Sequence, residues 1–246
     1  MILSACFINN KNAKIDHRVM SVLYLAIQHT YTEVQVGLYR DKKCLGALSL
    51  HKHHASSLLA SKVSTLLSQH RTNLTHINFI AVNQGPGPYT TLRVVIATVN
   101  GLSFALGIPL VGVDGIRTLV QEYPHKKNEV GVALLNAFNN DVYFAVKNTN
   151  GTIASGYANI ESLLLQLQQE YQDATICFLG SGTTLHQEEI KKAFPHAHFS
   201  SQLAYCPLNA LAHQGLHAWQ QKKHTSTQLQ PLYLKSTFGG IPNLAI

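Results

Sequence analysis

One stretch decides the fold, and it reads Ala-Val-Asn-Gln-Gly-Pro-Gly-Pro-Tyr-Thr-Thr-Leu-Arg from Ala81 to Arg93. An apolar run at 77–82 leads into it, and a long, mostly apolar run at 90–106 follows. This order predicts a buried strand, a loop rich in Gly and Pro, and then a helix. Gly107-Ile108-Pro109 is expected to end that helix, because Gly takes the left-handed conformation readily and Pro cannot continue a helix.

The loop itself contains Gly85, Pro86 and Gly87, and Thr90 opens the helix behind it. Gly permits positive φ and Pro stiffens the turn, so we expect a tight loop. Its backbone N–H groups lie at the start of the helix, where phosphate or carboxylate can bind; a plain strand-to-helix turn is the alternative. The loop lacks Gly-Lys-Ser or Gly-Lys-Thr, so a Walker-type nucleotide loop is not supported.

Outward from this loop, the first half predicts the order β-β-β-α-β-α-β. Strand-like runs lie at 22–28, 33–39 and 43–51, a run with helical spacing lies at 55–70, and a short apolar strand is expected at 110–113. Three consecutive strands that lead into alternating helix and strand favour a mixed sheet flanked by helices. The second half follows a looser version of this plan, with strands expected at 130–136, 141–147, 175–179 and 229–234 and helices at 160–170, 188–194 and 208–223.

Two weakly similar halves predict an α/β protein with two lobes. We expect the first lobe at 20–122 plus 207–246 and a smaller second lobe at 123–206. Residues 9–18 are polar and without a hydrophobic period, and Met20 stands just before the first strand. We therefore expect residues 1–19 to be a poorly ordered extension. A start codon assigned too far upstream, with Met20 as the true first residue, would also account for such a segment.

The composition indicates a folded protein with a basic surplus. Hydrophobic residues make up 46% of the chain, and the net charge is +7, from 19 basic and 12 acidic residues. A basic surplus favours anionic partners, but no basic stripe with interleaved aromatic residues indicates direct RNA binding. None of the four Cys forms a Cys-x-x-Cys pair, which fits a reducing cytoplasm better than a disulfide framework. No apolar run approaches the roughly 18 residues of a membrane span.

The stretch from residue 81 onward resembles the TsaB (YeaZ) family. That family reads G-P-G-S-F-T-G-L-R, then a helix of small residues, then L-G-I-P-L-x-G-V, and this chain matches it through Leu106-Gly107-Ile108-Pro109-Leu110. Pro88, Tyr89 and Thr91 stand where the family has Ser, Phe and Gly. Weaker matches lie at 25–30, 54–59, 180–182 and 231–235.

The resemblance implies the two-lobed α/β fold of actin, Hsp70 and the sugar kinases, in a small form. Family members pair with a catalytic paralogue, TsaD, which transfers threonylcarbamoyl from an adenylate to the adenosine beside the tRNA anticodon. A third protein, the ATPase TsaE, joins them. This chain is then expected to be a cytoplasmic, non-catalytic subunit that meets tRNA only indirectly, holds no cofactor and forms a homodimer when TsaD is absent.

Positions that hold catalytic or metal-binding residues in related proteins have other residue types in this chain. The actin-like fold holds Mg-ATP with an acidic residue in its first hairpin, where this chain has Gln28, and a neutral amide is a poor substitute. Asp114 stands alone where TsaD-like proteins have paired His, and Asn136 stands where relatives often have Asp. We therefore predict no catalytic residue and no metal site. His51, His53 and His54 invite a metal, but a surface or helix-cap role is favoured.

The two helices of the first half each carry a second face of small residues. Gly in mid-helix costs about 1 kcal/mol relative to Ala, so Gly101 indicates close approach of another backbone. A cation in the first helical turn is unfavourable by about 0.3–1 kcal/mol, which an anionic neighbour of Arg93 would offset. Contact with the chain's own sheet and a solvated Arg are the alternatives. The resemblance implies a partner interface that contains Ser57, Ser61, Ser64, Arg93, Val94, Ala97 and Gly101.

Two other functions stay open. The first is an enzyme, either a small actin-like ATPase or kinase, or a peptidase. It needs a carboxylate or metal site that the sequence does not show, and Ser181 lies in Gly-Ser-Gly instead of the Gly-x-Ser-x-Gly of a nucleophile elbow. The second is a self-associating homodimer with a separate role.

Overall fold

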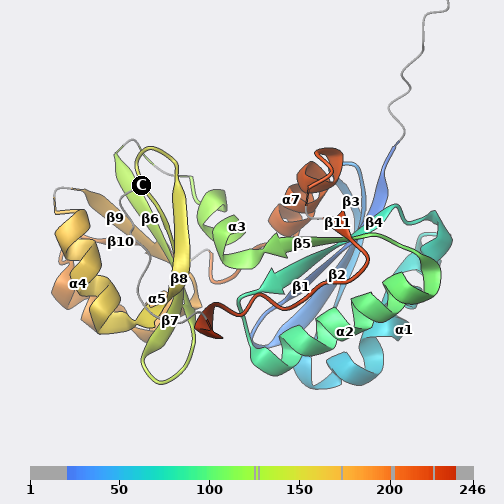
Figure 1. Cartoon of the computed structure of the whole chain (residues 1–246), viewed down its shortest axis with the longest axis horizontal. Helices are drawn as coiled ribbons and strands as arrows, with labels where there is room; N and C mark the ends of the chain where they lie inside the picture. The colour runs from blue at the N-terminus through green and yellow to red at the C-terminus, as the bar shows by residue number, and fades with distance from the viewer. Residues whose placement is uncertain are drawn as a thin grey trace, which may run out of the picture.

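The computed structural model describes residues 21–124, 126, 128–172, 174–200, 203–223 and 225–236. The expected extension at 1–19 and the end of the expected first lobe at 237–246 lie outside these residues. The described chain forms two β-sheets, one in each of two lobes that lie next to one another (Figure 1). The exact lobe limits expected above stay a prediction.

The first sheet has the strand order β11-β5-β4-β1-β2-β3. β2 (Glu33–Arg40) pairs antiparallel with both β1 (Leu23–His29) and β3 (Lys43–His51), and β4 (Phe79–Gly85) runs parallel to β1. β5 (Leu110–Asp114) is parallel to β4, and the short β11 (Thr225–Ser226) closes that edge. Every residue of β1 is buried, since helices cover both faces of the sheet at its centre.

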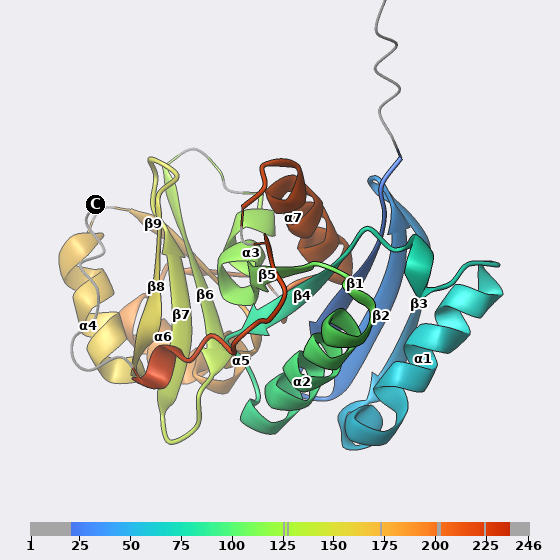
Figure 2. The same ribbon diagram turned by 45° about the vertical axis from the view of Figure 1, so that its right-hand side comes forward.

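Two helices cover each face of this sheet (Figure 2). α1 (Ala55–Gln69) and α2 (Tyr89–Leu106) lie together on one face, where they bury a stripe of apolar residues with helical spacing. α7 (Leu208–Gln220) and α3 (Gly115–Glu122) lie on the other face. α7 approaches β4 so closely that a Cβ atom at Gly215 would lie 2.4 Å from the Cβ of Ala81.

The second sheet has the order β10-β9-β6-β7-β8. β6 (Glu129–Asn136), β7 (Asp141–Lys147) and β8 (Ile153–Asn159) form an antiparallel meander, and β9 (Thr175–Leu179) and β10 (His198–Ser200) extend it in parallel. α4 (Ile160–Glu170) and α6 (Gln187–Ala193) pack on its outer face, and α5 (Ser181–Leu185) lies beside β6. Three short 3₁₀ helices complete the described chain: η1 (Lys52–His54), η2 (Leu74–His76) and η3 (Leu234–Ser236).

The two lobes share a hydrophobic core. One cluster of buried residues joins Tyr24, Ala26 and Phe79 of the first sheet to Ala133 and Ala145 of the second, with α3 and α7 between them. In it, Tyr24 stacks on Phe79 with ring centroids 4.5 Å apart, and Phe79 stacks on Trp219 at 4.9 Å. Shared apolar packing of this kind opposes independent motion of the lobes.

The order expected for the first half is confirmed through β5, but one expected strand is wrong, and α3 and β8 are among the elements that were not predicted. The strand expected at 229–234 is wrong: Pro231 has no N–H for a ladder, and the chain runs there without regular structure to η3. The helix α3 was missed, although Asp114 caps it by accepting from the backbone N–H groups of Ile116 and Arg117. β8 was missed because its sequence, Ile-Ala-Ser-Gly-Tyr-Ala-Asn, has few strongly strand-forming residues.

α2 is the helix of the described residues that is long and apolar enough to cross a membrane by length and composition, with a mean hydropathy of 1.2 over 18 residues. One side of it packs in the first core through Leu92, Val95 and Val99. Its side chains Asn100 and Ser103 also bond to the backbone of the segment that follows β11. These contacts are those of a core helix on a sheet.

Candidate functional site

The outer surface of α1 and α2, called here the α1–α2 face, exposes large apolar side chains. Phe104 is 93% exposed, Tyr89 60%, Leu106 46% and Leu58 40%. The two helices lie side by side on the side of the first sheet opposite α7 (Figures 1 and 2). Exposed aromatic and aliphatic side chains gathered on one helix pair mark a protein contact surface more often than a solvated one.

Most residues predicted for the partner interface lie on this face. Ser57, Ser61 and Ser64 are exposed on α1, and Arg93, Ala97 and Gly101 are exposed on α2. Val94 differs, because it is half-buried and packs against the core of the first lobe. The placement brings the predicted residues together on one surface, and their role in an interface stays a prediction.

The serine side of α1 is less polar than its sequence suggests. The hydroxyl of Ser57 donates to the carbonyl of His54, and the hydroxyl of Ser61 donates to the carbonyl of Leu58 at 2.9 Å. Thr65 donates in the same way to Ser61. Donors that already bond within their own helix lose little when a partner excludes water, so this side can be covered at low cost.

Gly101 has no structural reason within the described chain. A Cβ atom at this position would meet no atom within 4 Å, and the residue is exposed. Because Gly in a helix costs about 1 kcal/mol relative to Ala, its presence calls for an explanation outside the fold. Close approach of a partner helix is such an explanation.

Sequence reasoning missed Phe104 and misplaced Leu58. Phe104 follows Gly101 by three positions and Ala97 by seven, so the small-residue stripe itself pointed to it. Leu58 counts with Leu59 among the apolar positions that give the run at 55–70 its helical spacing, yet it is 40% exposed while Leu59 is 1% exposed. Leu58 lies about 100° around the helix axis from Leu59, on the side away from the buried stripe that continues through Val63 and Leu66.

Arg93 is held in place by aromatic side chains at the start of α2. Its Nη1 donates to the hydroxyl of Tyr89 at 2.7 Å, and its guanidinium lies 5.1 Å from the centre of that ring. Tyr89 in turn stacks on Tyr233, with centroids 5.8 Å apart. No ion pair of the described residues includes Arg93, so its charge is presented at the surface in a fixed direction.

The Gly-Pro loop is tight, as expected, but its two glycines are needed for different reasons. Gly85 has φ of 120°, and a Cβ there would lie 3.0 Å from the carbonyl oxygen of Leu232. Gly87 does not take positive φ; a Cβ there would lie 2.6 Å from the His29 ring. Pro86 is buried, and Thr90 is exposed at the first turn of α2. The loop is thus packed between β1 and the segment after β11.

His29 is a buried, neutral side chain behind this loop. It is 3% exposed, and burial lowers its pKa from 6.5 to about 4. Neither of its ring nitrogens has a hydrogen-bond partner in the described structure. A neutral imidazole in an apolar setting stabilises the fold only while it stays unprotonated.

A buried amide network contains Gln28, the residue at the position where the resemblance led us to look for an acid. Gln28 is 1% exposed, and its Nε2 donates to the carbonyl of Cys206 at 2.8 Å. Its Oε1 accepts from Nδ2 of Asn83 at 2.6 Å, and Oδ1 of Asn83 accepts from the backbone N–H of Gly85. The side chain at this position is therefore committed to bracing β1, β4 and the chain entering α7.

Further contacts tie the two lobes together. The Tyr31 hydroxyl donates to the carbonyl of Asn136 in the second lobe, and the Tyr31 ring stacks on Tyr205 at 5.8 Å. Lys235 of η3 reaches Asp141 at 3.8 Å. Phe138 is 60% exposed at the tip of the β6–β7 hairpin, and the centroid of its ring lies 6.4 Å from the centroid of the Tyr31 ring. These contacts join the two lobes.

The remaining candidates for chemistry act as caps. Asp114 caps α3, as described above, and burial raises its pKa. Oδ1 of Asn136 accepts from the backbone N–H of Phe138 in the hairpin turn. Nδ1 of His51 accepts from the backbone N–H of His53 and caps η1, which confirms the cap interpretation. Among the described residues, no group of three or more His, Cys, Asp or Glu is arranged to hold a metal ion.

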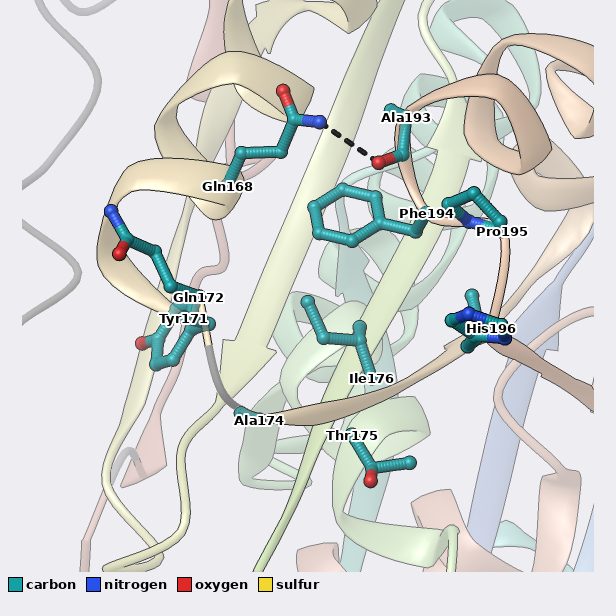
Figure 3. Close-up of a pocket in the computed structure, with 11 residues that line it drawn as sticks. Gln168, Tyr171, Gln172, Ala174, Thr175, Ile176, Ala193, Phe194, Pro195 and His196 are labelled. Atoms are coloured by element: carbon teal, nitrogen blue, oxygen red, sulfur yellow. Dashed lines mark hydrogen bonds between the residues drawn. The ribbon is translucent and has the colours of Figure 1, made fainter.

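A cavity of about 450 Å³ lies in the second lobe, between the end of α4, the start of β9 and the chain after α6 (Figure 3). The Nε2 of Gln168 donates to the carbonyl of Ala193 at 2.8 Å and bridges its two helices. Phe194 and Ile176 form its apolar floor, and His196 lies at its rim. None of the described residues that line this cavity is acidic. The cavity therefore does not supply the carboxylate that the hypothesis of an enzyme needs.

Comparison with known proteins identifies the family. A family model described as TsaD, tRNA N6-adenosine threonylcarbamoyltransferase, matches residues 49–235. A protein of Buchnera aphidicola subsp. Schizaphis graminum named tRNA threonylcarbamoyladenosine biosynthesis protein TsaB is 30% identical over 149 residues, which are 59% of this chain and 70% of that relative. This chain belongs to the TsaB branch of the TsaD family.

Other relatives agree with the TsaB assignment. The Escherichia coli TsaB is 29% identical over 122 residues, which cover 49% of this chain and 53% of that protein. The solved structure of YeaZ from Pseudomonas aeruginosa superimposes with a TM-score of 0.66 at 22% identity, over 87% of this chain and all of that one. The resemblance to TsaB is therefore confirmed, and so is the expected α/β fold with two mixed sheets flanked by helices.

Thr91, where the family motif has Gly, is now accounted for. Thr91 is 6% exposed and faces the interior, while its neighbours Tyr89 and Thr90 are exposed. The branched side chain therefore changes the packing beneath α2 and leaves the outer α1–α2 face of this TsaB family member unaltered.

Proposed function

We propose that this chain is the non-catalytic subunit that binds TsaD and supports threonylcarbamoyl transfer to the adenosine next to the tRNA anticodon. The names of its relatives place them in this biosynthesis. The observation that carries the proposal is the α1–α2 face, which exposes Phe104 at 93% and Leu58 at 40% beside the unexplained Gly101. Such a face is suited to packing against two helices of a partner.

The buried amide network supports a non-catalytic role. An actin-like enzyme uses a carboxylate in its first hairpin to orient magnesium and its waters, and Gln28 instead donates to Cys206 and accepts from Asn83. A buried amide with both ends bonded is a structural element, since moving it to meet a ligand would leave partners unsatisfied. The contribution of this chain to the reaction is then to stabilise and orient TsaD.

The wider assembly follows from the same family relationship. TsaE joins as a third component, tRNA is met through TsaD, and a weaker homodimer can form when TsaD is absent. The working place is the cytoplasm. We further propose that the lobes are those expected from the sequence, 20–122 plus 207–246 and 123–206, with the first lobe carrying the interface.

Titration with the cognate TsaD tests this function directly. Isothermal calorimetry of the full chain against TsaD is expected to give a complex of micromolar or better affinity. A reconstituted tRNA modification assay, run with TsaD, TsaE and the threonylcarbamoyl adenylate, is expected to require this chain. Absence of a complex at micromolar concentrations, or equal modification without the chain, would refute the proposal.

A further inference from the structure

Charge is distributed unevenly along this chain. Residues 42–113 hold no Asp or Glu, while they hold six cationic residues, namely Lys42, Lys43, Lys52, Lys62, Arg71 and Arg93. The rest of the chain then has 19 − 6 = 13 basic and 12 acidic residues, so its net charge is +1. Of the total of +7, +6 therefore belongs to the segment that builds β3, α1, β4 and α2.

Part of this segment, α1 and α2, forms the α1–α2 face, whereas Lys42 lies beside α7; the acids that flank the segment in sequence also lie elsewhere. Glu33 alternates with the core residues of β2 and lines the groove beside the start of α7. Asp41 lies in the β2–β3 turn, where it accepts from the backbone N–H of Val22. Asp114 caps α3 on the other face of the sheet. The charges carried by the helices of the face are Lys62 and Arg93.

We infer that Arg93 makes the α1–α2 face selective for an acidic protein surface and disfavours pairing with a second copy of this chain. This inference rests on the proposed function and names the chemistry of that partner. A carboxylate that meets the fixed guanidinium of Arg93 gains a charge-assisted hydrogen bond. In an isologous pair, the same face meets itself and supplies cations without any carboxylate from either helix pair.

A nucleic acid is the other polyanion that a cationic surface can bind. Phosphate backbones are held by dense Lys and Arg, with one counterion released for each contact. The α1–α2 face instead has large apolar side chains, with Phe104 93% exposed, and few cations on its helices. A mixed surface of this kind fits a helical protein partner that has an apolar centre and a carboxylate near its edge.

Salt dependence separates the two kinds of pairing. Salt screens attraction between opposite charges and repulsion between like charges, with a Debye length of about 10 Å at 0.1 M. Raising NaCl from 50 to 300 mM is expected to weaken the complex with TsaD by about tenfold. The same change is expected to strengthen self-association of the chain, as measured by sedimentation velocity.

Charge reversal at Arg93 completes the test. Arg93→Glu is expected to weaken TsaD binding by about 100-fold and Arg93→Gln by about tenfold, while self-association at 50 mM NaCl increases. Lys192→Glu makes the same change of charge at an exposed position of α6 in the second lobe, and it is expected to alter TsaD affinity by less than about twofold. Circular dichroism of each variant checks that it folds.

Each result of these experiments either supports or overturns the inference about Arg93. A TsaD complex that forms but ignores both salt and Arg93→Glu overturns this inference and leaves the proposed function intact. So does wild-type self-association that is as tight as the complex and falls with salt. Binding of a tRNA that Arg93→Glu abolishes, with TsaD affinity unchanged, assigns the charge to nucleic acid and also overturns it. If no TsaD complex forms, the proposed function fails, and the self-association series alone judges the charge argument.

Discussion

Truncating Phe104 to Ala is predicted to weaken TsaD binding while leaving the fold stable. Phe104 is 93% exposed, so its ring contributes little to the free chain. A buried aromatic side chain removes about 150–250 Å² from water, which at about 25 cal/mol per Å² corresponds to about 4–6 kcal/mol. The Ala side chain keeps part of that contact, so the expected loss in binding free energy is about 2–4 kcal/mol, or about 30- to 1,000-fold in Kd.

The assay is calorimetric titration of TsaD with wild-type and Phe104→Ala chains, together with urea denaturation of each chain alone. The free energy of unfolding is expected to stay equal or to rise by a few tenths of a kcal/mol, because Ala is the better helix former. Phe138→Ala is the matched control: it removes the same ring at a 60% exposed position at the tip of the β6–β7 hairpin. An unchanged Kd for Phe104→Ala, with a weakened one for Phe138→Ala, would refute the reasoning.

Three other substitutions test the face, the amide network and the buried imidazole. Gly101→Leu should raise the free energy of unfolding by about 0.5–1 kcal/mol, since no atom lies within 4 Å of its Cβ, yet weaken TsaD binding by about tenfold. Gln28→Glu should cost about 1–3 kcal/mol in urea denaturation, because the donor to the Cys206 carbonyl is lost. The pKa of His29 is lowered from 6.5 to about 4 in the fold, so the unfolded chain binds the proton first as pH falls. Unfolding free energies should therefore decrease by about 2 kcal/mol more between pH 7.5 and pH 5 in the wild type than in His29→Leu.

Each of these has an outcome that contradicts it. Gly101→Leu with unaltered TsaD affinity would mean that no partner backbone approaches the helix there. Gln121→Glu is the control for Gln28→Glu, because Gln121 uses only its acceptor, toward Gln214. Equal costs in the two variants would remove the argument from Gln28. Parallel pH profiles of the wild type and His29→Leu would mean that His29 is solvated in the fold.

The order of strands and helices in the first lobe could be predicted from the sequence. The loop 83–88 separates a β-branched run from a helical run, and Gly107 ends α2 in the left-handed conformation with φ of 68°. These signals are short-range, so chain neighbours suffice to interpret them. The strand expected at 229–234 failed for the opposite reason: the amide of Gln84 bonds to the carbonyl of Gln230, and distant contacts of this kind decide its path.

The candidate site was only partly readable. Spacing along one helix pointed to Ala97 and Gly101, because residues three and four apart share a face, and Arg93 stood out as a cation in the first helical turn. Which side of that helix meets the sheet depends on tertiary packing, and for that reason Phe104 and Leu58 were missed as exposed groups. The stacking of Tyr233 on Tyr89, which orients Arg93, joins positions 144 residues apart in sequence (233 − 89) and has no local signal.

Hydroxyl-radical footprinting tests the central claim most directly, because it reads the exposure of each aromatic side chain in the wild-type chain. Oxidation of Phe104 and Tyr89, on the α1–α2 face, is compared with that of Phe138 in the β6–β7 hairpin, with and without TsaD. The account predicts that TsaD protects Phe104 and Tyr89 and leaves Phe138 unchanged. Protection of Phe138 with Phe104 still reactive would contradict it, since the chain would then meet TsaD through the β6–β7 hairpin.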